Sequence, residues 1–309
     1  MIVFASSRAL ERAENIKAVY DSYKGEKAFC RLDKYGSGVD IRTGRYDLLV
    51  TDEYPSEAHS KVLMINHGIT GAKLSGLLMP HPYITDWNSK LLTYATTSGK
   101  DVIDIVAREC GIDRSNVVPT GMPRTDAYIG KHKGDGHTFL AKKRSYLFVP
   151  TFRGIYDKPM PDVDWKLIDD ALSDDEVFVV KAHMLTGCIV GRPFRHIVEI
   201  FGELPSTPYL IDSDVVITDY SSIMLDAMLL DKPVVLFGKD KSFLETRGMN
   251  FKYPDDYSSM YCTNETDLVQ IIRQANAPDN TAIDCRNRCA SDCDGHATKR
   301  VLDLMESML

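Results

Sequence analysis

Two adjacent serines, Ser221 and Ser222, stand where a short apolar run gives way to a segment with helical spacing. Residues 215–217 are Val-Val-Ile, the polar turn 218–222 reads TDYSS, and apolar residues then recur three or four positions apart up to residue 229. The first amides of a helix have no partner within it, so such a turn can hold a phosphate or a diphosphate. Serine is also a common helix cap. The spacing therefore leaves both interpretations open.

Two histidines follow other apolar runs of strand length. His67 comes directly after the run 61–66 (KVLMIN), and His183 comes two residues after the run 177–181. Open α/β sheets bind ligands beyond the carboxyl ends of their strands, and histidine can take up or release a proton near neutral pH. A single histidine in such a loop can also hydrogen-bond the loop itself. For His67 the position alone favours that structural interpretation.

Two arginines occupy comparable loops. Arg124 lies in the turn 121–126 (GMPRTD), which contains both glycine and proline, and Arg153 ends the segment 150–153 (PTFR). Each places a cation in a loop that follows an apolar run. For Arg124 the alternative is a salt bridge to Asp126 or to another neighbour.

The seven cysteines are an odd number scattered over the chain, which argues against a disulfide framework and favours a reducing cytosol. Cys285, Cys289 and Cys293 are spaced four residues apart, which would place them on one face of a helix. Three thiolates could hold zinc or an iron–sulfur cluster. Ligand pairs in zinc sites usually lie closer in sequence, so we expect a structural role for these three residues.

Alternating strand-like and helix-like segments must position these residues. Apolar runs of strand length begin at residues 2, 46, 61, 91 and 117 in the first half and at 146, 177, 215 and 233 in the second. They predict an α/β protein of two Rossmann-like, doubly wound domains that face each other across a cleft. Residues 130–143 are rich in Gly, Lys and His, so we expect them to link the two domains, which would span residues 1–138 and 139–309. The final helix could pack back on the N-terminal domain. No Gly-x-Gly-x-x-Gly fingerprint supports a nicotinamide or flavin cofactor.

The composition is that of a globular protein, with 309 residues of which 44% are hydrophobic and 26% charged. The net charge of -7 argues against broad nucleic-acid binding, which needs a basic face. The N-terminus lacks the pattern of a signal peptide, and no window approaches the roughly 18 apolar residues of a spanning helix. Any membrane contact should be peripheral. Residues 73–82 (KLSGLLMPHP) are its best candidate, although we expect them to be buried.

The loops taken together resemble those of the CDP-glycerol glycerophosphotransferase family, whose members prime and polymerise teichoic acids and related polyol-phosphate polymers. The resemblance covers roughly the last three quarters of the chain, from His67 onward, and the TDYSS turn with its downstream aspartate and Lys-Pro is its most specific part. The matching residues are His67-Gly68, Gly121-Met122-Pro123-Arg124 with Asp126, Pro150-Thr151-Phe152-Arg153, Lys181-Ala182-His183, Thr218-Asp219-Tyr220-Ser221-Ser222 with Asp226, Lys232-Pro233, Phe243 with Glu245 and Gly248, and Asp294-Gly295 with Ala297. Two positions depart from the family pattern. Asn66 stands where an aromatic residue is common, and Met184 where a proline is common.

The resemblance implies a GT-B-like fold and the transfer of glycerol phosphate, or a related polyol phosphate, from CDP-glycerol to an acceptor hydroxyl with release of CMP. The donor would be CDP-glycerol or a similar CDP-polyol, held mainly by the C-terminal domain. The acceptor would be lipid-linked or a growing polymer of the teichoic-acid or capsular type, and no nucleic acid would take part. The implied location is the cytoplasm or the inner face of the cell membrane.

The resemblance also assigns roles to single residues. His67 and His183 would be catalytic, and His67 would take the proton of the acceptor hydroxyl. The predicted ligands of the donor diphosphate and nucleotide are Arg153, Lys181, Thr218, Asp219, Ser221 and Ser222. The predicted supporting residues are Gly68, Arg124, Thr151, Asp226 and Glu245. We expect no cofactor and no protein-bound metal, although Mg²⁺ could accompany the donor diphosphate.

Two other functions compete with this one. A glycosyltransferase or epimerase that uses a UDP- or CDP-sugar would have the same architecture, because a diphosphate at a helix start suits many nucleotides. A non-catalytic nucleotide-binding protein is the third possibility. It would be expected to have lost the histidines, and both are present.

Overall fold

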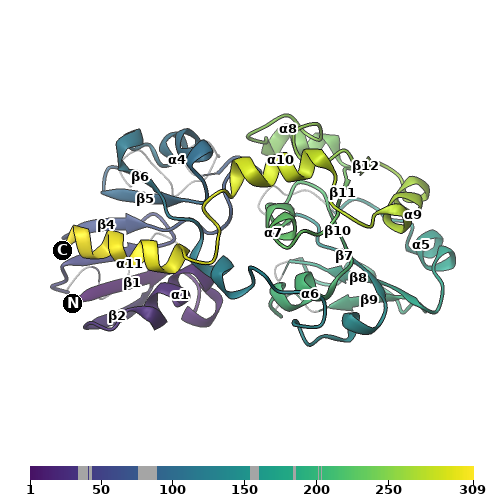
Figure 1. Cartoon of the computed structure of the whole chain (residues 1–309), viewed down its shortest axis with the longest axis horizontal. Helices are drawn as coiled ribbons and strands as arrows, with labels where there is room; N and C mark the ends of the chain where they lie inside the picture. The colour runs from purple at the N-terminus through teal and green to yellow at the C-terminus, as the bar shows by residue number, and fades with distance from the viewer. Residues whose placement is uncertain are drawn as a thin grey trace. The chain divides into compact units, whose positions relative to one another are not determined.

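The structure of the chain is a computed structural model that describes residues 1–33, 41, 44–75, 89–153, 160–183, 186–200, 202 and 204–309. The chain forms two compact units (Figure 1). Unit 1 contains Met1–Ile129 and Asn287–Leu309, and unit 2 contains Gly130–Arg286. The units therefore change between Ile129 and Gly130, at the start of the Gly/Lys/His-rich segment, whereas the sequence prediction sets the boundary after residue 138. The final helix belongs to unit 1.

Unit 1 is built on a sheet of six parallel strands in the order β2-β1-β3-β4-β5-β6. The strands are β1 (Ile2–Ser6), β2 (Lys27–Arg31), β3 (Leu48–Thr51), β4 (Lys61–Met64), β5 (Tyr94–Thr97) and β6 (Val117–Pro119). The helices are η1 (Leu10–Arg12), α1 (Glu14–Ser22), η3 (Lys100–Val102), α4 (Ile103–Cys110), η4 (Arg114–Asn116), η5 (Pro123–Ala127) and α11 (Ala297–Met308). Strand β2 was not predicted, because its sequence KAFCR mixes polar and apolar residues at an edge of the sheet.

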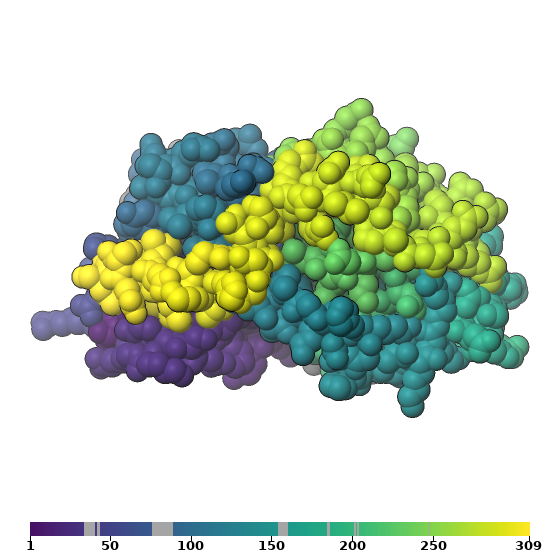
Figure 2. Space-filling model, in the orientation of Figure 1, coloured from purple at the N-terminus to yellow at the C-terminus, as the bar shows by residue number. Residues whose placement is uncertain are grey.

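Both faces of this sheet are buried, which explains why its inner strands read as continuous apolar runs. Along β1, Ile2 and Phe4 pack on one face, in a cluster with residues of α1 and α11. Val3 and Ala5 pack on the other face, with residues of α4. Figure 2 shows α11, in yellow, lying directly against the purple N-terminal segment that contains α1. The last helix of the chain therefore packs in the same core cluster as the first strand.

Unit 2 is built on a second sheet of six parallel strands in the order β12-β11-β10-β7-β8-β9. The strands are β7 (Arg144–Phe148), β8 (Glu176–Lys181), β9 (Ile197–Ile200), β10 (Val215–Thr218), β11 (Val234–Phe237) and β12 (Tyr261–Cys262). The helices are η6 (Phe139–Lys142), α5 (Trp165–Ala171), α6 (Thr207–Asp212), α7 (Ile223–Leu229), α8 (Lys241–Arg247), α9 (Glu265–Gln274) and α10 (Asn280–Cys289). The predicted α/β class with parallel sheets and covering helices is confirmed.

Each sheet has one position where the strand order reverses. In unit 1 the chain goes from β1 to β2 on one side and then to β3 on the other; in unit 2 it goes from β7 to β8 and β9 and then returns to β10. At such a switch point the loops that follow the two neighbouring strands diverge and leave a crevice for ligands. The candidate site of each unit lies at this place.

The three cysteines near the C-terminus do not share one helix, so that prediction was wrong. Helix α10 ends at Cys289, and Cys293 lies in the turn beyond it. All three thiols are buried and none forms a disulfide. Within the described ranges, no group of three or more His, Cys, Asp or Glu side chains is arranged to hold a metal ion. These observations favour the structural role.

The segment considered for membrane contact, residues 73–82, lies mostly outside the described residues, which stop at Ser75 and resume at Ser89. Its role stays a prediction. In the described part of the chain, no helix combines the length and the apolar character needed to cross a bilayer.

A buried aspartate holds the segment that opens unit 2. Both carboxylate oxygens of Asp212 accept hydrogen bonds, from Gly134 N at 2.8 Å, Gly136 N at 3.0 Å, Thr138 N at 2.7 Å and Thr138 Oγ1 at 2.8 Å. A Cβ on Gly136 would overlap the carbonyl oxygen of Pro208, so this close approach requires glycine. Burial by itself would raise the pKa of Asp212, but the hydrogen bonds outweigh it and hold this pKa below its usual range.

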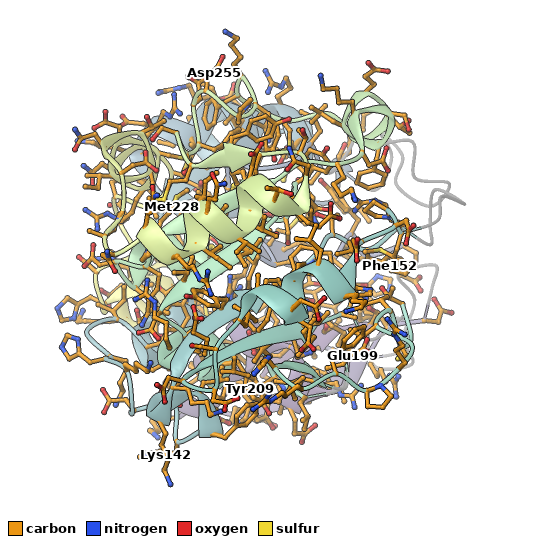
Figure 3. All side chains as sticks on the ribbon, turned by 90° about the vertical axis from the view of Figure 1, so that its right-hand side faces the viewer. Lys142, Phe152, Glu199, Tyr209, Met228 and Asp255 are labelled. Carbon is orange, nitrogen blue, oxygen red and sulfur yellow. The ribbon has the colours of Figure 1, made fainter. Side chains whose placement is uncertain are left out.

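We expect Asp212→Ala to lower the free energy of unfolding by roughly 3 kcal/mol, because four donors lose their charged acceptor. Since the folded-state pKa is depressed, the carboxylate contributes stability above the unfolded-state pKa of about 3.9, and this contribution is lost as the pH falls through the folded-state pKa. Urea denaturation at pH 7 and at pH 3 measures both effects. Lys142→Ala, at an exposed position of the same segment (Figure 3), is the control. Equal stability of the two variants at pH 7 would contradict the assignment.

Candidate functional site

The switch point of unit 2 is organised by the carboxylate of Asp219, the first residue after β10. Its Oδ1 accepts hydrogen bonds from Thr151 N at 2.8 Å, from Thr151 Oγ1 at 2.6 Å and from Tyr220 N at 2.6 Å. Its Oδ2 accepts a hydrogen bond from Arg153 Nη2 at 2.6 Å. One carboxylate therefore ties the loop after β7 to the loop after β10.

Arg153 is enclosed by protein, with only 2% of its side chain exposed. Besides Asp219, its Nη1 donates to Thr151 O at 2.6 Å, and its Nε lies 3.6 Å from Asp240 Oδ2. The guanidinium carbon stands 3.8 Å from the centroid of the Phe243 ring, which is a cation–π contact. These contacts make Arg153 a residue that positions the loops around it, and its direct contact with a diphosphate stays a prediction.

The two serines of the TDYSS turn begin α7. Ser222 is the N-cap residue, but its side chain makes no capping hydrogen bond. Ser221 Oγ accepts only a long hydrogen bond of 3.4 Å from Ile223 N. The turn is instead held from its start, where Thr218 Oγ1 donates to Val149 O at 2.6 Å. Capping thus makes little use of the two hydroxyl groups, and both serines are half-buried at the start of the helix.

The two predicted residues at the end of β8, Lys181 and His183, differ in their exposure to solvent. Lys181 is buried, donates from Nζ to Gly202 O at 3.0 Å, and has its pKa lowered by burial. These contacts favour a structural role. His183 is exposed, and its ring stacks on Phe152 of the loop after β7, with 4.9 Å between centroids and 29° between planes. Phe152 is labelled in Figure 3. Met184 lies outside the described residues.

Asp226 and Glu245 lie on the helices that follow these loops. Asp226 is buried on α7, whereas Glu245 is exposed on α8. The start of α8 is joined to the site through Asp240, whose Oδ1 accepts a hydrogen bond from Phe243 N at 2.9 Å while its Oδ2 faces Arg153. The loops after β7, β10 and β11 are therefore linked within unit 2.

At the switch point of unit 1, the loops after β1 and β3 lie beside His67, which follows β4. Half of the His67 side chain is exposed. Its Nδ1 lies 2.9 Å from Arg8 Nη2 and 3.4 Å from Asp52 Oδ2. Arg8 follows β1, Asp52 follows β3, and the two form an ion pair of 2.6 Å. On the other side of the ring, Nε2 lies 4.0 Å from Glu53 Oε1.

Asp52 carries a buried charge beside this histidine. Burial alone would raise its pKa, but the hydrogen bond with His67 and the positive charges of His67 and Arg8 outweigh burial and lower it. The carboxylate is therefore ionised at neutral pH. The sequence prediction missed Arg8, Asp52 and Glu53, although each follows an apolar run just as His67 does. The rule that found the histidine could have found them.

Arg124 and Asp126 are in the same 3₁₀ turn, η5, but have different partners. Arg124 Nη1 lies 3.9 Å from Glu14 Oε2, a neighbour as the alternative interpretation expected. Asp126 instead accepts hydrogen bonds from Ala297 N at 3.0 Å and Thr298 N at 2.7 Å, at the start of α11. It caps the last helix of the chain. Gly68 lies half-buried in the loop directly after His67.

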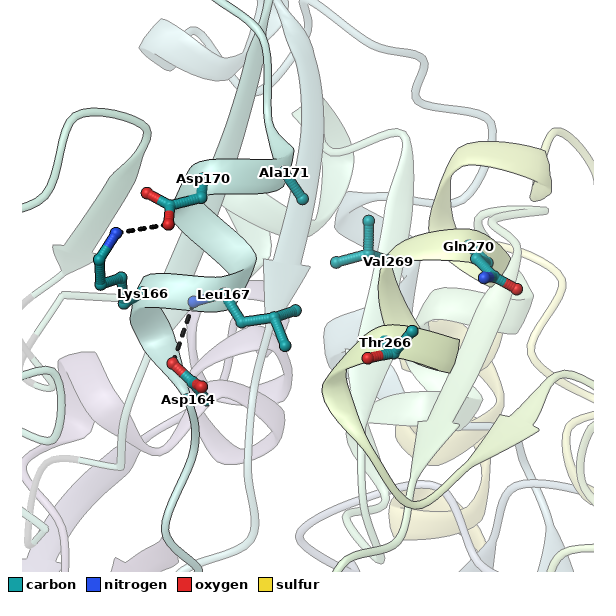
Figure 4. Close-up of a pocket in the computed structure, with 8 residues that line it drawn as sticks. All are labelled: Asp164, Lys166, Leu167, Asp170, Ala171, Thr266, Val269 and Gln270. Carbon is teal, nitrogen blue, oxygen red and sulfur yellow. Dashed lines mark hydrogen bonds and ion pairs between the residues drawn. The ribbon is translucent and has the colours of Figure 1, made fainter.

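A groove of about 600 Å³ lies elsewhere in unit 2, between α5 and α9. Figure 4 shows Leu167 and Val269 pointing toward one another across it. None of the predicted site residues lines this groove. It is not the place where the sequence prediction puts the chemistry.

Comparison with known proteins identifies the family of the chain. A family model described as CDP-Glycerol:Poly(glycerophosphate) glycerophosphotransferase matches residues 46–307. The chain belongs to this family. The resemblance seen in the loops is therefore confirmed.

Curated members of the glycerophosphotransferase family are similar over most or all of the chain. A teichoic acid poly(ribitol-phosphate) polymerase of Bacillus spizizenii is 25% identical over 98% of this chain and 55% of its own length. A teichoic acid ribitol-phosphate primase of the same species is 25% identical over 100% of this chain and 91% of its own. A teichoic acid glycerol-phosphate primase of Bacillus subtilis is 23% identical over 70% and 58%. The chain thus spans about half the length of several relatives that it matches.

Solved structures share the fold. The wall teichoic acid polymerase TagF matches with a TM-score of 0.76 and 16% identity, over 99% of this chain and 88% of the TagF chain. A UDP-GlcNAc 2-epimerase from Neisseria meningitidis matches with a TM-score of 0.57 and 12% identity, over 99% of both chains. At these identities the likeness concerns the fold alone.

We expect Arg153→Ala to lower the free energy of unfolding by about 3–5 kcal/mol, because it leaves the buried carboxylate of Asp219 without its cation. Arg192→Ala is the matched control, since Arg192 also stacks on an aromatic ring, that of Phe194, but is exposed. Its loss should stay below about 0.5 kcal/mol. Urea denaturation measures both. If Arg153→Ala cannot be purified folded, Arg153→Lys, which keeps the charge but not the geometry, should still be less stable than the control; equal stability would contradict the buried pair.

Proposed function

We propose that this chain transfers a polyol phosphate, glycerol phosphate or a close relative, from a CDP-polyol to an acceptor hydroxyl and releases CMP. The observation that carries the proposal is the histidine of unit 1, held beside a buried, ionised aspartate at a sheet switch point in a member of the glycerophosphotransferase family. The proposed pathway is the synthesis of a teichoic-acid-like or capsular polymer. The acceptor is lipid-linked or a growing chain.

The names of the relatives support this class of donor. They include ribitol-phosphate and glycerol-phosphate primases and polymerases, and a TagF variant has been solved after soaking with CDPG. Glycerol and ribitol are therefore the two polyols to test first. The proposed location is the cytoplasm or the inner face of the membrane, as the family resemblance implies.

The loops of unit 2 suit the donor. The hydroxyls of Ser221 and Ser222 and the amides at the start of α7 offer donors to a diphosphate, and Asp219 and Arg153 fix the turn that presents them. His183, stacked on Phe152, offers a further donor that carries positive charge when protonated. Mg²⁺ could accompany the diphosphate with few protein ligands.

His67 supplies the base. The acceptor oxygen forms a bond to the phosphorus that bears the polyol, the bond from that phosphorus to CMP breaks, and the hydroxyl proton passes to the imidazole. Arginine can only donate, and Arg8 Nη2 lies 2.9 Å from Nδ1 and 3.5 Å from Nε2. When the nearer nitrogen, Nδ1, accepts this hydrogen bond, a neutral ring carries its proton on Nε2. Proton transfer to Nε2 requires the other tautomer, with Nδ1–H turned to Asp52 and the Nε2 lone pair turned to the acceptor hydroxyl. Arg8 and Asp52 therefore compete for one nitrogen atom.

The alternative is a nucleotide-sugar transferase or epimerase. The fold is similar to that of UDP-GlcNAc 2-epimerases, and one architecture can serve both polyol-phosphate transfer and nucleotide-sugar chemistry. The alternative therefore remains to be tested.

We expect His67→Ala to lower kcat for transfer by about 10²- to 10⁴-fold, the usual contribution of a general base, while the affinity for the donor stays nearly unchanged. His59→Ala, at an exposed position of unit 1, should leave kcat unchanged. Release of CMP from the CDP-polyol measures turnover, and calorimetry measures donor binding. Lost donor binding with normal residual turnover would reverse the assignment.

We expect CDP-glycerol or CDP-ribitol, but not UDP-sugars, to raise the Tm of the protein, because a ligand that binds only the folded state stabilises it in proportion to RT ln(1 + [L]/Kd). Each nucleotide is added separately in a thermal melt and then tested for turnover. Stabilisation by UDP-sugars alone would exclude the polyol-phosphate transferase and favour the alternative.

A further inference from the structure

The side chain of Asn15, at the start of α1, joins two loops of unit 1 that the sequence keeps far apart. Its Nδ2 donates to the carbonyl oxygens of Asn66 at 2.8 Å and His67 at 3.1 Å. Its Oδ1 accepts a hydrogen bond from the backbone N–H of Arg124 at 2.9 Å. Only 3% of the residue is exposed. The carboxamide thus lies between the loop that carries the histidine and the turn that carries the arginine.

The chemistry of these three partners fixes the orientation of the carboxamide. All three are backbone groups, so Asn66 and His67 can only accept and Arg124 can only donate. A side chain at this position therefore needs two donor hydrogens and one acceptor oxygen within the length of an asparagine. Aspartate has the shape but no donor, and leucine has the size but neither group.

Other hydrogen bonds attach the loop that carries His67 to the end of β5 and the residue after it. The Asn66 side chain donates to Thr96 O at 3.2 Å, and Thr70 N donates to Ser98 Oγ at 3.0 Å. The two Asn15 bonds are made to the backbone of Asn66 and of the histidine itself, at the start of this stretch. His67 Nδ1 lies 2.9 Å from Arg8 Nη2 and 3.4 Å from Asp52 Oδ2. Because these two distances are so similar, a small displacement of the loop changes which of the two side chains the ring contacts.

We infer that Asn15 is a positioning residue that sets the place of the His67 ring between Arg8 and Asp52 and couples it to the turn of Arg124. The inference rests on the proposed function for its effect on catalysis, but not for its effect on the ring. A residue that merely attached α1 to the sheet would affect stability and leave the ring unchanged.

The test uses the full chain with Asn15→Leu and Asn15→Asp. The ¹⁵N chemical shifts of the His67 ring, which report its tautomer and hydrogen bonds, should differ from those of the unsubstituted protein in both variants. Asp212→Ala, which removes buried hydrogen bonds in unit 2, is the control for lost stability and should leave these shifts unchanged. Ring signals that stay the same in folded Asn15→Leu, or an Asn15→Asp variant that behaves like the unsubstituted protein, would overturn the inference.

Kinetics give the second readout. We expect kcat to fall between about 10- and 100-fold in Asn15→Leu, the scale on which a misplaced catalytic group lowers the rate, with the donor KM within about two-fold of normal. In a His67→Ala background the same substitution should change the residual rate less than about two-fold, because its route of action has been removed. Full additivity of the two substitutions would overturn the inference. Equal turnover by the unsubstituted protein and His67→Ala would instead reject the proposed function, and the ring shifts would still decide the role of Asn15.

Discussion

The buried carboxylate of Asp219 is the interaction on which the candidate site of unit 2 depends. A charge that leaves water must be paired and hydrogen-bonded, and Asp219 meets this requirement with Thr151, Tyr220 and Arg153. Because these partners come from the loops after two different strands, satisfying the charge also fixes those loops to one another. The shape of the TDYSS turn therefore depends on the burial of this aspartate, together with the hydrogen bond from Thr218 Oγ1 to Val149 O.

Unit 1 uses the same device with a different result. There too an aspartate directly after a strand pairs at 2.6 Å with an arginine from the loop after the neighbouring strand, Asp52 with Arg8. In unit 2 the arginine is closed off by Phe243, whereas Arg8 remains 37% exposed and reaches His67. A sealed pair holds a loop rigid, while an open pair beside a histidine can exchange hydrogen bonds with it. Burial of the cation thus separates a pair that only joins two loops from a pair that also contacts a histidine.

The parallel sheets explain why both devices lie where they do. Strands buried on both faces are largely apolar, so most polar residues gather at their ends, and in a parallel sheet the carboxyl ends all lie along one edge. Asp52, His67, His183 and Asp219 all follow strands at such edges. Each charge there needs a partner from another loop, and long-range contacts such as those of Asn15 hold these loops in place.

The sequence by itself determined the fold class and the places where polar chemistry could occur, because continuous apolar runs and the polar residues that follow them are local features. It gave the inner strands of both sheets, the two histidines and the TDYSS turn. It missed β2, β9 and β12, which lie at sheet edges or are short and so lack a clear apolar run. The sequence analysis also placed Cys293 on the same helix as Cys285 and Cys289, whereas that helix ends at Cys289.

Only the tertiary structure decided which partners each polar residue has. Arg153, which the family resemblance assigned to a diphosphate, has its guanidinium enclosed by contacts with Asp219 and Phe243, and its contact with a diphosphate stays a prediction. Asp126 caps a helix that lies 171 residues further along the chain, and Arg8, Asp52 and Asn15 reach His67 from three separate segments. Hydrogen-bond partners across such separations depend on how the strands are ordered in the sheet. That order follows from the packing of the whole unit and is absent from any single stretch of sequence.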